Sequence, residues 1–230
     1  DEPNGPLHKY VLIQPKRCSI RYDKFPYPLS NIRGTLVMRD DAWTFHELEG
    51  TNDTGRVCCE GHMTPPQQGQ ALYLRLQATD VPLEEELRDA LRPNLQRLWN
   101  SMRPRGTVDL EEVGVRYLPG QKRLSVSLRA KPQPESTSIE PVHFPYRMER
   151  LQGVLAYRDG HVTLNRFQAE HGPVKITSGG RCSFRTDGSW DLSLEGLTVD
   201  RLRLEDRELI QALPGRLKKA IVELKPGGPV

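Results

Sequence analysis

The sequence has little of what several large classes of protein require. Lys and Arg together outnumber Asp and Glu by only 33 to 30, so the chain lacks the strong positive charge on which nucleic-acid binding depends. No apolar run approaches the ~20 residues that a membrane-spanning helix needs. Four cysteines, Cys18, Cys58, Cys59 and Cys182, are too few for a disulfide framework. We therefore expect neither a nucleic-acid partner nor a small disulfide-bonded protein.

Motifs typical of enzymes are also missing. The sequence contains no Gly-x-Ser-x-Gly, no phosphate-binding loop and no dinucleotide fingerprint. Its most metal-like segment, Cys58-Cys59-Glu60-Gly61-His62, lacks the spacing of a zinc site and has no second pair of ligands after it. We predict a protein that is not an enzyme, with no catalytic residue, no metal and no cofactor.

What the sequence does contain is an internal repeat. Phe25-Pro26-Tyr27 recurs as Phe144-Pro145-Tyr146, and the two segments align without gaps, 119 residues apart, through Met63 and Cys182. Nine of 39 aligned positions are identical, where chance gives about two at ~6% per position. The identical pairs are Phe25/Phe144, Pro26/Pro145, Tyr27/Tyr146, Gly34/Gly153, Leu36/Leu155, Arg39/Arg158, Asp40/Asp159, Thr44/Thr163 and Gly61/Gly180.

Most of each copy alternates apolar and polar residues with a period of two. The alternating apolar residues include Leu72, Leu74 and Leu76, then Leu124, Val126 and Leu128, then Trp190, Leu192 and Leu194. This pattern predicts antiparallel strands with one apolar and one polar face. Asp40-Asp41 and Asp159-Gly160 lie where tight hairpin turns are expected. The four repeated glycines fall inside strands, where glycine marks a bulge or the close approach of another backbone.

The period becomes helical near the end of each copy. From Pro82, apolar residues recur at helical spacing through Leu87, Leu91, Leu95 and Met102, and a second such stretch runs from about Asp206 to Leu224. Pro93 should kink the first helix or split it in two, and Pro214 lies at nearly the same depth in the second. We expect these apolar stripes to pack on the apolar face of the sheet.

These patterns together predict an α+β fold built from tandem repeats. Each repeat has five to six strands of a curved antiparallel sheet, followed by an amphipathic helix packed on the apolar sheet face. Repeat 1 covers residues 1–105 and lacks its first strand, and repeat 2 covers residues 106–230. The two sheets can also be one continuous sheet.

The repeated pattern resembles the AsmA-like proteins, members of the wider group of repeating β-groove envelope proteins. The resemblance rests on Phe-Pro-Tyr, an apolar-x-Gly strand, an Asp turn and Arg56-Val57-x-x-x-Gly61, with Lys175-Ile176-Thr177-Ser178-Gly179-Gly180 in the second copy. It implies a long periplasmic protein of the cell envelope, anchored in a membrane by a segment outside this chain. Such proteins are linked to phospholipid transport between the inner and outer membranes and to outer-membrane biogenesis and maintenance.

Two functions remain open at this stage. In the first, the apolar sheet face is a groove for phospholipid, with contacts from Leu72, Leu74, Leu76, Leu124, Val126, Leu128, Leu192 and Leu194. In the second, the helices seal that face completely, and the chain is a structural or protein-interaction module without a ligand. The expected partners are phospholipid, neighbouring repeats of the same chain and the membrane that holds the anchor.

Overall fold

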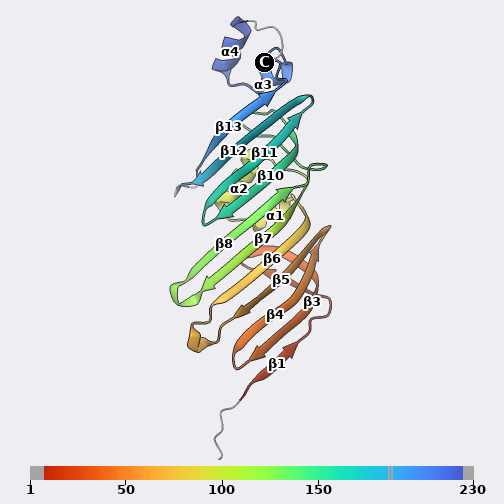
Figure 1. Cartoon of the computed structure of the whole chain (residues 1–230), viewed down its shortest axis with the longest axis vertical. Helices are drawn as coiled ribbons and strands as arrows, with labels where there is room; N and C mark the ends of the chain where they lie inside the picture. The colour runs from red at the N-terminus through yellow and green to blue at the C-terminus, as the bar shows by residue number, and fades with distance from the viewer. Residues whose placement is uncertain (1–7, 186, 188, 225–230) are drawn as a thin grey trace, which may run out of the picture. The chain divides into compact units, whose positions relative to one another are not determined.

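The strands of this protein form one antiparallel sheet. The computed structural model describes residues 8–185, 187 and 189–224, and within them the sheet has 13 strands (Figure 1). The strands are β1 (Tyr10–Ile13), β2 (Cys18–Tyr22), β3 (Phe25–Arg39), β4 (Ala42–Asn52), β5 (Gly55–Met63), β6 (Leu72–Pro82), β7 (Thr107–Leu118), β8 (Arg123–Pro132), β9 (Ser138–Ile139), β10 (Met148–Arg158), β11 (His161–His171), β12 (Val174–Phe184) and β13 (Trp190–Asp200). Their order is β1-β3-β4-β5-β6-β7-β8-β10-β11-β12-β13, with β2 beside β3 and β9 beside β10.

Short helices interrupt this succession of strands. The α-helices are α1 (Glu85–Ala90), α2 (Pro93–Met102), α3 (Arg207–Ala212) and α4 (Gly215–Leu224), and single 3-10 turns lie at Pro66–Gln68 and Pro119–Gln121. Each expected amphipathic helix is thus two helices. The first is divided at Pro93, which lacks the N–H that would continue a helix through this point. The antiparallel sheet is confirmed, but the fold is mainly β rather than α+β because the helices are so short.

The chain divides into two compact units. Unit 1 consists of residues 1–81 and 110–129, and unit 2 of residues 82–109 and 130–230. In the part of unit 1 that the structure describes, the elements are strands and 3-10 turns, whereas all four α-helices belong to unit 2.

The hairpins of both units turn at the expected aspartates. Asp40 and Asp41 have φ of 48° and 66°, and Asp159 and Gly160 have φ of 48° and 91°. A two-residue turn whose central residues both have positive φ matches the twist of the flanking strands. The hairpins predicted at these residues are therefore confirmed, joining β3 to β4 and β10 to β11.

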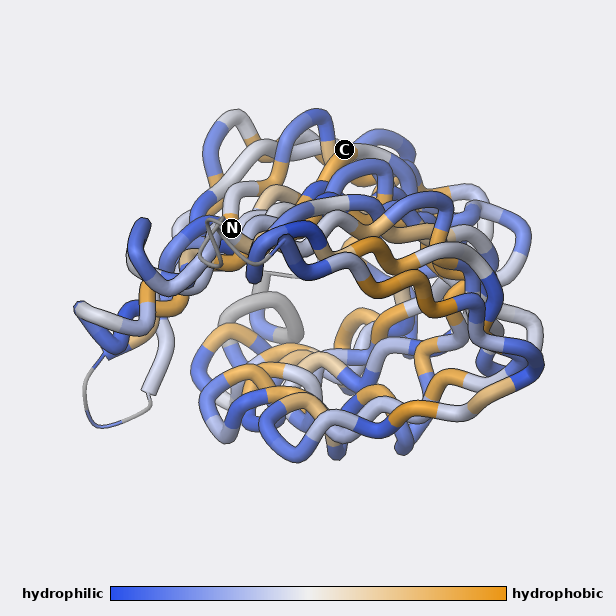
Figure 2. Tube along the Cα trace, turned by 90° about the horizontal axis from the view of Figure 1, so that it is seen from below, coloured by the Kyte–Doolittle hydropathy of each residue, from blue (hydrophilic) through white to orange (hydrophobic). Residues whose placement is uncertain are grey.

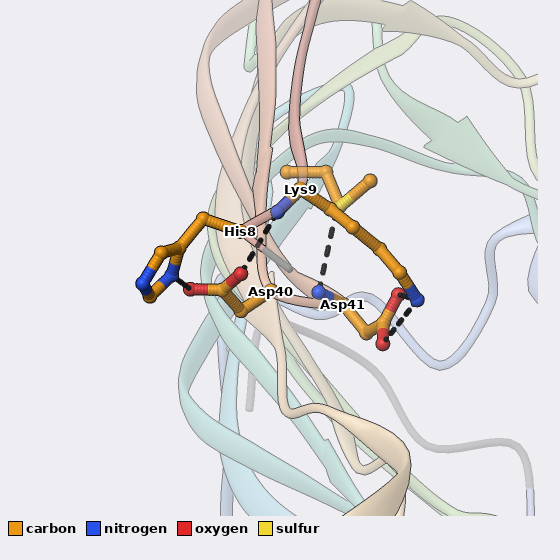
Figure 3. Close-up of polar contacts among 5 residues, drawn as sticks. His8, Lys9, Asp40 and Asp41 are labelled. Atoms are coloured by element: carbon orange, nitrogen blue, oxygen red, sulfur yellow. Dashed lines mark hydrogen bonds and ion pairs between the residues drawn. The ribbon is translucent and has the colours of Figure 1, made fainter. Parts of the chain in front are cut away.

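The β3–β4 turn also holds the N-terminal strand of unit 1 (Figure 3). The backbone N–H of Lys9 donates to Asp40 Oδ1 over 3.0 Å, and the Lys9 ammonium lies 3.2 Å from both carboxylate oxygens of Asp41. His8 Nδ1 lies 3.3 Å from Asp40 Oδ2. The Lys9 N–H bond, with His8, lowers the pKa of the Asp40 carboxyl. These contacts fasten the start of β1 to the far end of β3.

Helix α3 packs into a cluster of buried residues in unit 2. Leu209 and Ala212 of α3 are buried with Tyr146, and the partly buried residues around them are Phe144, Ile176, Leu202, Leu204 and Leu213. Asp206 caps α3 by accepting the N–H of Glu208 over 2.8 Å. Helix α3 therefore covers the end of the sheet where β10 and β12 begin.

Candidate apolar surface

In unit 1 the strand register places apolar side chains in rows across one sheet face. Because directly opposed residues in an antiparallel sheet share a face, each row can be followed from strand to strand. One row contains Val11, Met38, Trp43, Met63 and Leu72, and the next contains Ile13, Leu36, Phe45, Gly61 and Leu74. Leu48, Cys59 and Leu76 form a third. The alternation of hydrophobic and hydrophilic residues along the strands is visible in Figure 2.

Unit 2 repeats the first two rows. Tyr157, Val162, Cys182 and Leu192 form one, and Leu155, Leu164, Gly180 and Leu194 form the other. On the opposite face the register aligns Thr163, Arg181 and Ser193. The structure therefore has the two-faced sheet that the alternating sequence predicted.

The eight leucine and valine positions expected to touch lipid fall on three strands. Leu72, Leu74 and Leu76 lie on β6 at the ends of the three rows of unit 1 and are half-buried. Leu124 is exposed and Val126 and Leu128 are half-buried on β8. Leu192 and Leu194 lie on β13, where they are 37% and 46% exposed. Leu72, Leu74 and Leu76 share one face of β6, and Leu192 and Leu194 share one face of β13. The first set belongs to unit 1 and the second to unit 2.

Helix α3 does not cover the exposed leucines of β13. It packs near Ile176, at the start of β12, whereas Leu192 and Leu194 pair with Cys182 and Gly180 toward the end of that strand. Leu197, farther along β13, is also exposed. The apolar face of β13 thus remains accessible at positions that the sequence assigned to a ligand.

The repeated glycines lie where another backbone approaches. A Cβ built on Gly180 would lie 2.7 Å from the carbonyl oxygen of Ser193, and one built on Gly61 would collide with the carbonyl oxygen of Tyr73. Gly34 and Gly153 interrupt the register of their hairpins and have φ of 124° and 114°. The bulge or close approach expected at these glycines is confirmed at all four positions.

A polar cluster that the sequence did not reveal joins α3 to the sheet. His171 Nδ1 donates to the carbonyl oxygen of Arg147 over 2.7 Å, and its Nε2 lies 2.9 Å from a carboxylate oxygen of Glu208. The ring of Tyr146 lies 3.9 Å from that of His171, centroid to centroid. Burial, together with Asp206 and Glu208, raises the pKa of Tyr146 to about 12. The only sequence signal was that His171 replaces Asn52 in the aligned copy.

The metal-like segment Cys58–His62 lies on strand β5, which directs successive side chains to opposite faces. Cys58 and Cys59 are neighbours on β5, so their side chains lie on opposite faces, with Cys58 exposed and Cys59 half-buried. Burial, aided by Glu60, raises the pKa of the Cys59 thiol to about 11. Among the described residues, no group of three or more His, Cys, Asp or Glu side chains is placed to hold a metal ion.

A small cavity lies at the β7–β8 hairpin of unit 1. It has a volume of about 280 Å³ and is lined by Arg116, Leu118, Gln121, Arg123 and Ser125. The Arg116 guanidinium lies 5.5 Å from the ring centroid of Tyr73, which itself stacks on His62. Tyr73 alternates with Leu72 and Leu74 on β6, so this stack belongs to the polar face and not to the leucine rows.

Comparisons with known proteins do not assign this chain to a family. No family model matches it, and no curated protein and no solved structure matches it either. Among the residues described, no helix has the length and apolar character needed to cross a membrane.

Proposed function

We propose that this chain is a tandem-repeat segment of an AsmA-like protein of the cell envelope, in which the apolar sheet face contacts phospholipid. The protein would act in phospholipid transport between membranes or in outer-membrane maintenance, from the periplasm and through a membrane anchor outside this chain. The proposal has two parts, the repeat and the lipid groove, and different observations support them.

The repeat is supported by left-handed backbone conformations, which residues other than glycine rarely adopt. Left-handed φ angles recur 119 residues apart at Asn31 and Arg150, with 56° and 52°, and at Glu47 and Arg166, with 47° and 51°. A positive φ costs roughly 1–3 kcal/mol at a residue other than glycine, so coincidence at matched places is unexpected for unrelated segments. The strands match as well: β3 to β6 correspond in order to β10 to β13, and α1 and α2 to α3 and α4.

The observation that carries the lipid proposal is the exposure of the leucine rows. A soluble sheet normally buries its apolar face against another layer, since the apolar contact stabilises the fold. Here Leu192 and Leu194, at the ends of two adjacent apolar rows, are 37% and 46% exposed. An acyl chain lying along such rows would gain about 0.8 kcal/mol for each buried methylene group. A line of leucines is therefore a chemically suitable contact surface for phospholipid tails.

The second candidate function, a sealed structural or protein-interaction module, has its own supporting observation. In unit 2, Val162 and Cys182 lie on the same row as Leu192, and both are buried. The middle of that row is therefore already covered by protein. The two functions differ in whether the outer positions of the row are filled by lipid or by another protein.

Native mass spectrometry of the protein purified from a bacterial host with two membranes distinguishes them. We expect phospholipid to co-purify with the wild-type chain and to be reduced in Leu194→Asp, which puts a charge on the apolar row. Ser193→Asp is the matched control, because its neighbouring side chain lies on the opposite face, and it should retain the lipid. Absence of phospholipid from the wild type, or equal loss in both variants, would contradict the lipid groove and favour the sealed module.

A further inference from the structure

The cavity at the β7–β8 hairpin is lined mainly by cationic and polar side chains. Arg116 of β7 and Arg123 of β8 line it from the two strands, and Gln121 and Ser125 add an amide and a hydroxyl group. All these residues belong to unit 1. Each of the four side chains can donate hydrogen bonds, and the two arginines are always charged. The cavity is therefore suited to an anion.

Ring contacts hold the guanidinium of Arg116 in place. It lies 5.5 Å from the ring centroid of Tyr73, and the Tyr73 ring stacks on His62 with 4.9 Å between centroids. A cation over an aromatic face is attracted by the ring, so the stack favours one position of this long side chain. Because Tyr73 alternates with Leu72 and Leu74 on β6, the cavity belongs to the polar face of unit 1.

The two arginines of the cavity differ from their neighbour in lacking a carboxylate partner. Arg129, farther along β8, lies 3.7 Å from a carboxylate oxygen of Glu111. Among the side chains that the structure describes, no carboxylate forms an ion pair with Arg116 or Arg123. Both side chains are exposed, so a ligand can reach them. Two positive charges at one cavity are thus not neutralised by the described part of the chain.

We propose that this cavity binds a phosphomonoester group. Such a group carries a charge of about −1.5 to −2 near neutrality, which matches two guanidinium groups better than the single charge of a carboxylate does. Guanidinium groups donate paired hydrogen bonds to phosphate oxygens, and Gln121 and Ser125 can donate to the remaining ones. The volume of about 280 Å³ suits a small ester. The proposal does not rest on the lipid groove, whose leucine rows lie on the opposite face.

NMR titration of the whole isotope-labelled chain with glycerol 3-phosphate tests the site. At constant ionic strength we expect saturable shifts of the backbone amides within residues 116–125, whereas acetate at the same concentration should cause none. Arg116→Gln and Arg123→Gln should each weaken binding about tenfold, because each removes charge-assisted hydrogen bonds to the phosphate. Arg129→Gln, on the same strand but outside the cavity, is the matched control and should bind like the wild type.

The outcomes that overturn the proposal are equally specific. Shifts in the wild type that do not saturate, or equal affinity in the wild type, Arg116→Gln and Arg123→Gln, would show that there is no phosphate site. Unchanged urea midpoints in the three arginine variants would show that they remain folded. Leu194→Asp should leave glycerol 3-phosphate binding unchanged, because Leu194 belongs to unit 2, so this proposal and the lipid groove fail separately.

Vesicles distinguish the two possible sources of the phosphate group. Phosphatidic acid has a phosphomonoester headgroup, and we compare phosphatidylcholine vesicles with and without it by co-sedimentation. Binding only to the vesicles that contain phosphatidic acid, weakened in Arg116→Gln but not in Arg129→Gln, identifies a lipid headgroup. Binding of glycerol 3-phosphate without binding to either vesicle identifies a soluble ester.

Discussion

Asn52 and His171, 119 residues apart, make the same hydrogen bond at the ends of β4 and β11. Asn52 Nδ2 donates to the carbonyl oxygen of Pro28 over 2.8 Å, and His171 Nδ1 donates to that of Arg147 over 2.7 Å. The two acceptors are themselves 119 residues apart. His171 makes one further contact, because its second ring nitrogen, Nε2, lies 2.9 Å from a carboxylate oxygen of Glu208 at the start of α3.

The contact between His171 and Glu208 should hold α3 on the sheet. We predict that His171→Asn keeps the bond to Arg147, as Asn52 does to Pro28, but frees α3. Because Glu208 is 71% exposed, solvent screening limits the loss to about 0.5–1 kcal/mol. Faster amide exchange within residues 207–212 at low ionic strength is the measurement. Glu208→Gln should also speed amide exchange in α3. Glu195→Gln is the control, because Glu195 pairs with Arg181 on the surface, and it should leave this exchange unchanged. An unchanged exchange rate in His171→Asn would contradict the prediction.

The two adjacent glycines of β12 should respond differently to alanine. Gly180→Ala should destabilise the protein by roughly 1–3 kcal/mol, because its Cβ would meet the carbonyl oxygen of Ser193 at 2.7 Å. Gly179→Ala is the matched control, since its Cβ would be in ordinary contact at 3.6 Å from Leu164 O. Urea unfolding, followed by circular dichroism, measures both. Equal urea midpoints for the two variants would show that the close approach of Ser193 to Gly180 does not affect stability.

The four cysteines should fall into two classes of reactivity. Burial raises the pKa of the Cys59 thiol to about 11 and also raises that of Cys182, so little thiolate forms at either site near neutrality. Cys18 and Cys58 are exposed. Alkylation in mildly alkaline buffer, mapped by peptide mass spectrometry, should label Cys18 and Cys58 first and the other two only after unfolding. Rapid labelling of Cys182 in the folded protein would contradict its burial.

Tyr146 should make stability depend on pH in the alkaline range. Its pKa rises from an ordinary 10.0 to about 12 in the folded protein, so the unfolded chain loses this proton first and stability falls between pH 10 and 12. The buried hydroxyl has no hydrogen-bond partner among the described residues. Tyr146→Phe should therefore be neutral or more stable by about 1 kcal/mol below pH 10, and should lose less stability above it. Parallel stability curves for both proteins across pH 10 to 12 would contradict this assignment.

Local sequence patterns predicted the sheet well, because each pattern has a local cause. Alternation at Leu72, Leu74 and Leu76 defines a strand face, and Asp40-Asp41 has the backbone preferences of a tight turn. The division of each amphipathic stretch followed from the missing N–H of Pro93 and its counterpart. The α+β class was wrong, since periodicity shows that a helix is present but not how small its share is beside the strands.

Contacts between distant segments could not be predicted in the same way. The pairing of His171 with Glu208 depends on how α3 folds back on the sheet, which the sequence does not encode locally. Whether α1 and α2 belong to unit 1 or unit 2 likewise depends on tertiary contacts and not on local sequence. For the leucines, alternation showed which side chains share a face, but only the packing shows that Leu192 is more exposed than Cys182 on the same row.

Site-specific photocrosslinking in cells tests the lipid groove most directly. A photoreactive amino acid placed at Leu74 or Leu194 lies on the apolar rows, and the same amino acid at Arg75 or Ser193 lies one residue away on the polar face. The proposed function predicts crosslinked phospholipid at Leu74 and Leu194 and none at Arg75 and Ser193. Crosslinks to protein alone at the leucine positions, or equal lipid labelling on both faces, would contradict it.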